Sequence, residues 1–203
     1  TRGVFKSVQA ARIAALLAWR AQLNSDRVGG LLFAPGIHHE LPPRGGQAAV
    51  VRWLKMIAIN APDCRQVAYP PHQAALFTES LARLRRVAKP GSLVFLISDF
   101  HALDEHGRSE LSRLASHTDT ALALVTDRLD QEFPVLQRSG AIGDRHLTIQ
   151  LGSVSEAQTQ QYRSRFAERT DALRELCKEQ RMLFSHITTE DDAVVALMKL
   201  FQT

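Results

Sequence analysis

Polar residues that could take part in chemistry gather in one short stretch, residues 99–106. Asp99 follows Ser98 at the end of residues 92–97, a continuous apolar run typical of a parallel strand covered on both faces. A carboxylate at the end of such a strand stands where a cation or a hydroxyl group is held. It is equally a residue that caps the next loop or helix by accepting backbone N–H groups, and the sequence leaves both interpretations open.

His101, Asp104 and His106 follow Asp99 closely and suggest a metal site. Their spacing fits no pair of ligands on one helix, and zinc needs a defined tetrahedral ligand set, whereas hard cations prefer oxygen. A polar loop leading into a helix is therefore the favoured interpretation. A metal-assisted hydrolase centred on Asp99, His101 and Asp104 is the enzymatic alternative.

Two other pairs of potential ligands favour structural roles. His38 and His39 lie at a predicted hairpin tip, and because neighbouring side chains of a strand point to opposite faces, a solvated turn is expected. Cys64 and Cys177 are far apart and form no CxxC pair. They indicate reduced thiols in the cytosol, with neither a disulfide framework nor a zinc site.

A basic cluster ends one predicted helix: Arg83, Arg85, Arg86 and Lys89. There it complements the negative end of the helix dipole. Binding to nucleic acid would need aromatic platforms or more basic residues nearby, and the sequence offers neither. The net charge of +4 is spread along the chain, and the mixed charges of residues 163–178 predict an outward helix face. We expect no nucleic-acid partner.

The familiar catalytic and cofactor motifs are absent from the sequence. It contains no GxGxxG, GxxxxGK[ST], GxSxG or HExxH, and residues 140–143 (GAIG) are too sparse to cradle phosphate. We therefore expect a protein without catalytic activity. No apolar stretch reaches 18 residues, so no membrane span is predicted, and 45% hydrophobic with 23% charged residues is typical of a soluble globular domain.

The hydrophobic pattern of the sequence predicts the helices and strands that position these residues. Helices are predicted over residues 5–24, 50–58, 74–87 and 105–116, over a long segment opened by a Ser153–Glu156 capping box, and over a last segment capped by Thr188 or Thr189. Strands are predicted over residues 27–33, 37–41, 92–97, 120–125, 146–151 and 182–187, with loops at 42–46 and 62–72. The alternation predicts one α/β domain over residues 1–203, with a doubly wound, mainly parallel sheet. Its strands end at Ala34, Asp99, Asp127 and Thr188, where ligands would gather.

Five strings, taken together, resemble a known bacterial family. They are FKSVQAA at residues 5–11, AALLAW at 14–19, DRVGGLLF at 26–33, LVFLISDF at 93–100 and DRLDQEFP at 127–134. They are similar to the C-terminal half of domain-of-unknown-function family 58, which is related to von Willebrand factor A domains. The likeness covers nearly the whole chain.

The resemblance implies a sheet of the von Willebrand factor A type with a metal-ion-dependent adhesion site. Such a site holds Mg²⁺ through an Asp-x-Ser-x-Ser loop, a Thr and an Asp that corresponds to Asp99. Because the loop is expected before Phe5, we expect this stretch to lack the first strand and the metal loop. The threonine ligand is expected near Ala75 and Leu76, where no Thr is present. Thr78 is close but is predicted inside a helix. Mg²⁺ is therefore expected for the full-length protein and not for this fragment.

The resemblance also implies a partner. Members are often encoded beside MoxR-type AAA+ ATPases, which implies an interaction module that serves the assembly or maturation of other proteins. A cytoplasmic location is expected, or membrane association through an upstream region. A missing first strand would leave a gap in the sheet, and we expect it to favour homodimerisation by edge pairing.

Overall fold

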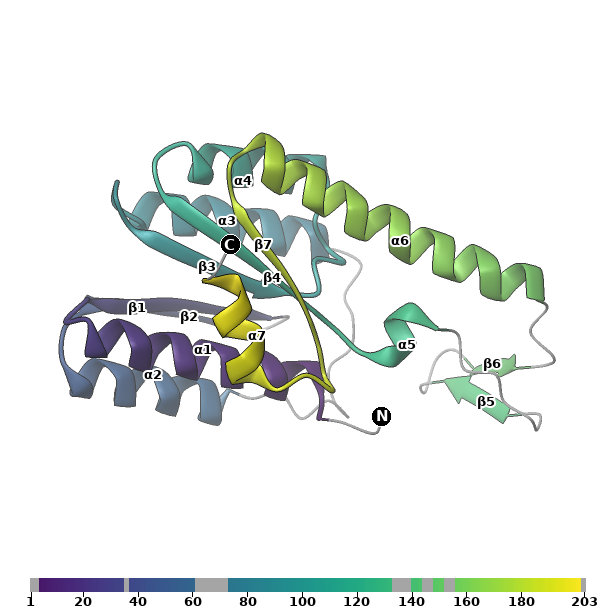
Figure 1. Ribbon diagram of the computed structural model, residues 1–203, viewed down its shortest axis with the longest axis horizontal. Helices are drawn as coiled ribbons and strands as arrows, with labels where there is room; N and C mark the ends of the chain where they lie inside the picture. The colour runs from purple at the N-terminus through teal and green to yellow at the C-terminus, as the bar shows by residue number, and fades with distance from the viewer. Residues whose placement is uncertain are drawn as a thin grey trace.

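The computed structural model describes residues 4–34, 37–60, 73–132, 140–143, 148–151 and 156–201 (Figure 1). The helices are α1 (Lys6–Leu23), α2 (Gln47–Ile59), α3 (Gln73–Val87), α4 (Glu105–Ala115), α5 (Arg128–Gln131), α6 (Glu156–Glu179) and α7 (Ala193–Leu200). The strands are β1 (Val28–Ala34), β2 (Ile37–Arg44), β3 (Leu93–Ser98), β4 (Asp119–Thr126), β5 (Gly140–Gly143), β6 (Thr148–Leu151) and β7 (Leu183–Thr188).

A parallel sheet in the order β3-β4-β7 lies at the centre of the described structure (Figure 1). The middle strand, β4, is buried along nearly its whole length because it has a neighbour on each side and helices on both faces. Leu122 and Leu124 face one layer of helices, whereas Ala123 and Val125 face the other, as the two-residue period of a strand requires. The predicted α/β class is confirmed.

Two hydrophobic cores hold the helices against this sheet. On one face α3, α4 and α6 contribute Phe77, Leu81, Leu111, Leu114, Leu173, Leu176 and Cys177. On the other face α1 and α7 contribute Ile13, Leu197 and Leu200. Burial of one such leucine or isoleucine side chain contributes about 1.5–3 kcal/mol, so these contacts hold the helices against the sheet.

The remaining described strands form antiparallel hairpins instead of joining the parallel sheet. β1 pairs with β2, with Ala34 opposite Ile37, and β5 pairs with β6. The prediction of one mainly parallel sheet is therefore corrected, and Ala34 does not end a strand of the central sheet. Strands that follow each other in sequence with a short connection usually pair with each other, and a short connection allows only antiparallel pairing.

Two local predictions also change. Pro42 and Pro43 lie within β2 and not in a loop; an edge strand tolerates proline because one side of it needs no N–H donor. α7 begins after Asp192, whose side chain accepts the N–H groups of Val194 and Val195, so the helix is not capped by a threonine. Residues 62–72, 146–147 and Ser153 lie outside the described residues.

Helix α2 covers the β1–β2 hairpin at a position where only glycine fits. A Cβ atom added at Gly30 would overlap the ring of Trp53 on α2. The absence of a side chain at Gly30 therefore lets the indole lie directly on β1, which anchors the hairpin beneath the helix.

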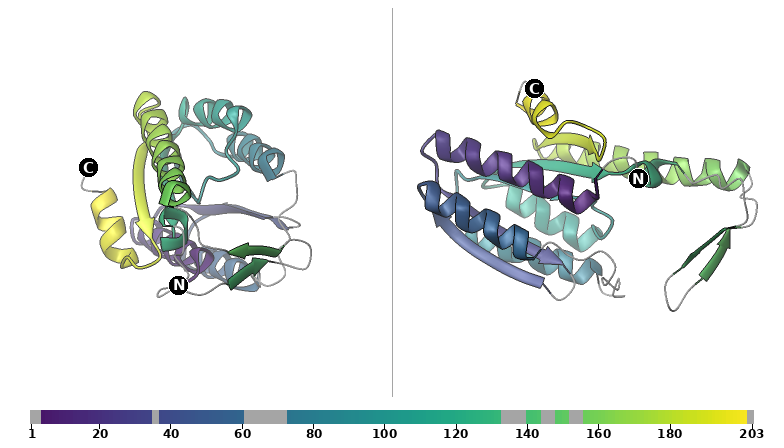
Figure 2. Two further views of the ribbon diagram at one scale, coloured as in Figure 1. Left: turned by 90° about the vertical axis from the view of Figure 1, so that its right-hand side faces the viewer. Right: turned by 90° about the horizontal axis from the view of Figure 1, so that it is seen from below.

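The β5–β6 hairpin lies near the N-terminal end of α6, away from the parallel sheet (Figures 1 and 2). Among the described residues, no helix combines the length and the apolar character needed to cross a bilayer.

Candidate functional site

Asp99 follows the last residue of β3 and lies in a tight turn at the carboxyl edge of the parallel sheet. The Phe100 N–H donates to Ser98 Oγ (3.1 Å), and the His101 N–H donates to Asp99 Oδ1 (3.2 Å). Phe100 has φ = 52°, a left-handed conformation that is unfavourable for a residue with a β-carbon. Its ring is 2% exposed and packs edge-on against Phe77, so the core holds the turn in place.

The side chain of Lys6, the first residue of α1, reaches this turn. Its Nζ lies 3.2 Å from Asp99 Oδ2 and 3.1 Å from the carboxylate of Asp130. The side chains of Lys6 and Asp99 are 29% and 31% exposed, whereas that of Asp130 is only 12% exposed. Burial by itself would lower the pKa of Lys6, but the charges and hydrogen bonds of the two carboxylates outweigh it and raise that pKa above its ordinary value.

One turn later in α1, the buried side chain of Gln9 fixes the helix against the same edge. Its Nε2 donates to the carbonyl oxygens of Thr188 (3.1 Å), the last residue of β7, and of Asp191 (2.8 Å), which follows that strand. Residues three apart on a helix share a face, so this anchor also sets the position of Lys6.

Asp130 is held by the short helix α5 that follows β4. Asp127 and Asp130 form a reciprocal capping box: Asp127 Oδ1 accepts the Asp130 N–H (3.1 Å) and Asp130 Oδ2 accepts the Asp127 N–H (2.9 Å). Burial would raise the pKa of Asp130. Hydrogen bonds from His101 and the Asp127 backbone, together with the Lys6 charge, lower it well below its usual range.

His101 connects Asp130 to the long helix α6. Arg169 Nη1 lies 2.6 Å from His101 Nδ1, and His101 Nε2 lies 3.5 Å from Asp130 Oδ1. Because a guanidinium group has only donors, Nδ1 must accept, and the hydrogen of the neutral ring is then on Nε2, which faces the carboxylate. The five residues form what we term the carboxyl-edge cluster: Lys6, Asp99, His101, Asp130 and Arg169.

Of the residues that the sequence suggested as a metal group, Asp99 and His101 lie in the cluster, whereas Asp104 serves another element. Asp104 is the N-cap of α4: its Oδ1 accepts the Gly107 N–H (2.8 Å) and the Thr78 hydroxyl (3.2 Å). The Gly107 hydrogen bond is the main reason that the pKa of Asp104 is lowered. Within the described part of the chain, no three His, Cys, Asp or Glu side chains are arranged to hold a metal ion.

The groups around Asp99 do not suit Mg²⁺. One of its carboxylate oxygens faces the Lys6 ammonium and the other accepts a backbone N–H. An ammonium group has no lone pair to give to a metal, whereas Mg²⁺ requires a near-octahedral set of oxygens. Thr78, the residue nearest the expected threonine ligand, donates to Asp104 instead.

Three members of the cluster were missed from the sequence, although two carried a signal. The Asp127-x-x-Asp130 spacing is that of a capping box. Arg169 was assigned to the outward face of α6, yet it stands three residues after Phe166 and four before the buried Leu173, on the inward stripe. Lys6 had no local signal, since its partners are 93 and 124 residues away.

The other predicted positions lie outside the cluster. His38 and His39 do not lie in the predicted turn at the hairpin tip; both are exposed residues of β2, paired with Phe33 and Leu32 of β1. In the basic cluster, Arg83 pairs with Glu40 at 2.8 Å and Arg85 with Glu110 at 3.0 Å. Cys177 is buried in the core, which raises the pKa of its thiol to about 12, and Cys64 lies outside the described residues.

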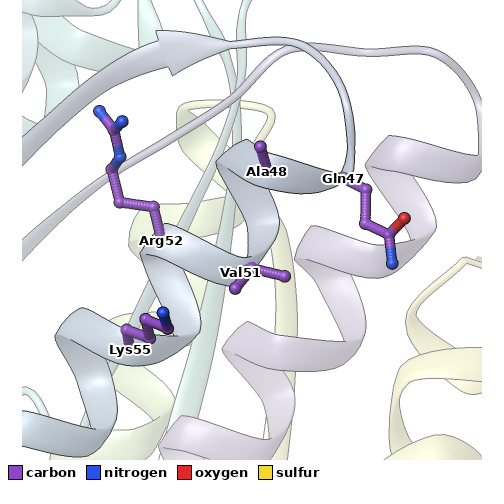
Figure 3. A pocket seen from close by; sticks show the side chains of 5 residues that line it. All are labelled: Gln47, Ala48, Val51, Arg52 and Lys55. Carbon is purple, nitrogen blue, oxygen red and sulfur yellow. The ribbon is translucent and has the colours of Figure 1, made fainter.

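Hollows on the surface of the described residues include the following two. The first, of about 440 Å³, is lined by one stretch of α2 (Figure 3): Gln47, Ala48, Val51, Arg52 and Lys55. The second, of about 550 Å³, shares α1 and α5 with the carboxyl-edge cluster and is lined by charges of both signs: Val4, Arg12, Arg128, Thr189, Glu190, Asp191 and Asp192. The second hollow therefore extends the polar surface that the cluster begins.

Comparisons with known proteins show which solved structures share this fold and which family the sequence matches. Comparison with curated proteins gave no significant match. The crystal structure of the conserved hypothetical protein BatB from Bacteroides thetaiotaomicron is similar, with a TM-score of 0.58 and 16% identity over 97% of this chain and 86% of that chain. The crystal structure of an aerotolerance-related membrane protein from Bacteroides fragilis with multiple mutations to serines is also similar. Its TM-score is 0.58 and its sequence identity 15%, over 97% of this chain and 86% of that chain. These likenesses show a shared fold. Residues 1–187 match the family model described as protein of unknown function DUF58, and the chain belongs to that family.

Proposed function

We propose that this chain is a non-catalytic protein-interaction module that docks its partner at the carboxyl-edge cluster. The observation that carries the proposal is the bridge from the Lys6 ammonium to the carboxylates of Asp99 and Asp130, at the edge where the parallel strands end. Ligands of open parallel sheets bind at this edge, and a sheet of the von Willebrand factor A type would use it in the same way.

The direction of the pKa shifts favours docking over catalysis. An acid–base catalyst works best when its pKa lies near the operating pH. In the cluster the pKa of Asp130 is lowered and that of Lys6 is raised, so both groups stay charged at neutral pH. Fixed charges of this kind suit the recognition of complementary charges on another protein.

Partial exposure makes these charges reachable. Lys6 and Asp99 present about a third of their side chains to solvent, and His101 presents 46%. The lining of the neighbouring hollow adds the basic Arg12 and Arg128 and the acidic residues 190–192. A surface that carries both signs of charge fits a polar protein segment better than a small apolar ligand.

We further propose a MoxR-type AAA+ ATPase as the partner, in the assembly or maturation of other proteins. The support is the family resemblance, because relatives are often encoded beside such ATPases.

Calorimetric titration with the neighbouring ATPase tests the proposal. We expect binding by the unaltered chain, and at least about 10-fold weaker binding by Asp99→Ala, since the substitution removes one partner of a partly buried charge pair. Asp119→Ala is the matched control, because Asp119 is exposed at the opposite, amino end of β4. Absence of binding with and without Mg²⁺, or equal losses in the two variants, would contradict it. Phosphatase or esterase activity that Asp99→Ala abolishes would instead favour the hydrolase.

A further inference from the structure

The position expected for a metal ion beside Asp99 is taken by a group that belongs to the chain itself. The Lys6 Nζ lies within hydrogen-bond distance of Asp99 Oδ2 (3.2 Å) and of Asp130 (3.1 Å), and so joins the turn after β3 to the helix after β4. A divalent cation bound between two carboxylates would make the same connection.

We propose that Lys6 is a tethered cation that replaces a divalent metal ion at Asp99. Two carboxylates drawn into a partly buried site repel each other unless a positive charge lies between them. An ammonium with three donors supplies that charge and a hydrogen bond to each of them. Because it is covalently attached to α1, it is present at any concentration of free metal ion.

The replacement of a metal ion by Lys6 has a structural consequence. A free ion would neutralise the carboxylates without reference to α1, whereas the Lys6 ammonium reaches them only when the first turn of α1 is docked. The Gln9 hydrogen bonds to the last residue of β7 and to Asp191 hold that turn in place. Assembly of the charge cluster and docking of α1 are therefore one event, and the cluster needs no metal. This inference does not depend on the identity of any partner.

Thermal unfolding with Mg²⁺, with Mn²⁺ and with EDTA tests the inference. The midpoint of the unaltered protein should be the same in all three. Lys6→Met keeps the length of the side chain but removes its charge. Its midpoint should fall by about 4–8 °C in EDTA, and millimolar Mg²⁺ or Mn²⁺ should recover part of that loss. The exposed Lys89, as Lys89→Met, is the matched control and should respond to neither ion.

Two outcomes would overturn the inference. One is a midpoint of the unaltered protein that rises with Mg²⁺ and no longer does so in Asp99→Asn, because the metal would then bind despite Lys6. The other is a Lys6→Met variant that neither ion stabilises. If Lys6→Met does not fold, Lys6→Gln, which keeps a hydrogen-bond donor, serves for the same comparison. Lys6→Arg, which keeps the charge, should remain insensitive to both ions.

Discussion

Removing the charge of Asp130 should destabilise the protein in a pH-dependent way. Asp130→Asn keeps the size of the side chain and one acceptor oxygen, but it loses the charge that faces Lys6 and His101. The Asp130 side chain is 12% exposed, so solvent screens this charge weakly. A hydrogen bond to a charged group contributes about 1.5–3 kcal/mol. We therefore expect a loss of about 2 kcal/mol in the free energy of unfolding at pH 7, or about 4–8 °C in the melting temperature.

The sign of the pH dependence follows from the pKa of Asp130. It is lowered in the folded protein, whereas in the unfolded chain it has its ordinary value of about 3.9. The stabilisation is thus fully present above the unfolded pKa and is lost as the pH falls toward the folded one. The difference between the unaltered protein and Asp130→Asn should be constant near neutrality and should narrow progressively below about pH 4.

Urea unfolding at a series of pH values between 7 and 3 measures this difference. Asp119→Asn, at the exposed amino end of β4, is the control and should track the unaltered protein. A variant as stable as the unaltered protein at pH 7 would refute the role given to Asp130. So would a loss that stays the same from pH 7 to pH 3, because it would arise from packing and not from charge.

Three further substitutions or modifications test other parts of the structure. Gly30→Ala should cost about 1–3 kcal/mol, since the new Cβ meets the ring of Trp53, and the fluorescence of that residue during urea unfolding should show the loss. Asp192→Ala should remove the cap of α7 and about 1 kcal/mol of stability, with faster amide exchange at Val194 than in the unaltered protein. Cys177, whose pKa is raised to about 12 by burial, should resist iodoacetamide in the native state and react in urea, as peptide mass mapping of the alkylated protein would show. Rapid native alkylation would contradict its burial.

Local sequence patterns located the elements better than their partners. The runs that became β3 and β4 are continuous and apolar, and their predicted ends fall within a residue or so of the observed ones. β5 was missed because GAIG has too few residues to show a period. The hairpin formed by β1 and β2 was predicted from the sequence, but its separation from the parallel sheet was not. That separation depends on which backbone groups meet in three dimensions, and no local pattern of residues 27–33 encodes it.

The candidate site was foreseen in one respect. The apolar run before Asp99 predicted a carboxylate at the carboxyl edge of the sheet, and its position after β3 confirms this. Its partners were not foreseen, because Lys6 reaches it across 93 residues of chain. Asp104, which follows within five residues, was grouped with it by proximity in sequence but serves as a helix cap. Whether Asp99 ligates a metal in the full-length protein stays a prediction.

The left-handed conformation of Phe100 links the surface of this protein to its interior. The unfavourable backbone is sustained by an aromatic ring that lies in the same core as α3. A substitution that loosens this core would release the backbone and swing the neighbouring carboxylate away from its lysine, although no surface residue had changed. If the cluster docks a partner as proposed, partner binding and fold stability should therefore decline together in variants of the Phe77 side of the core.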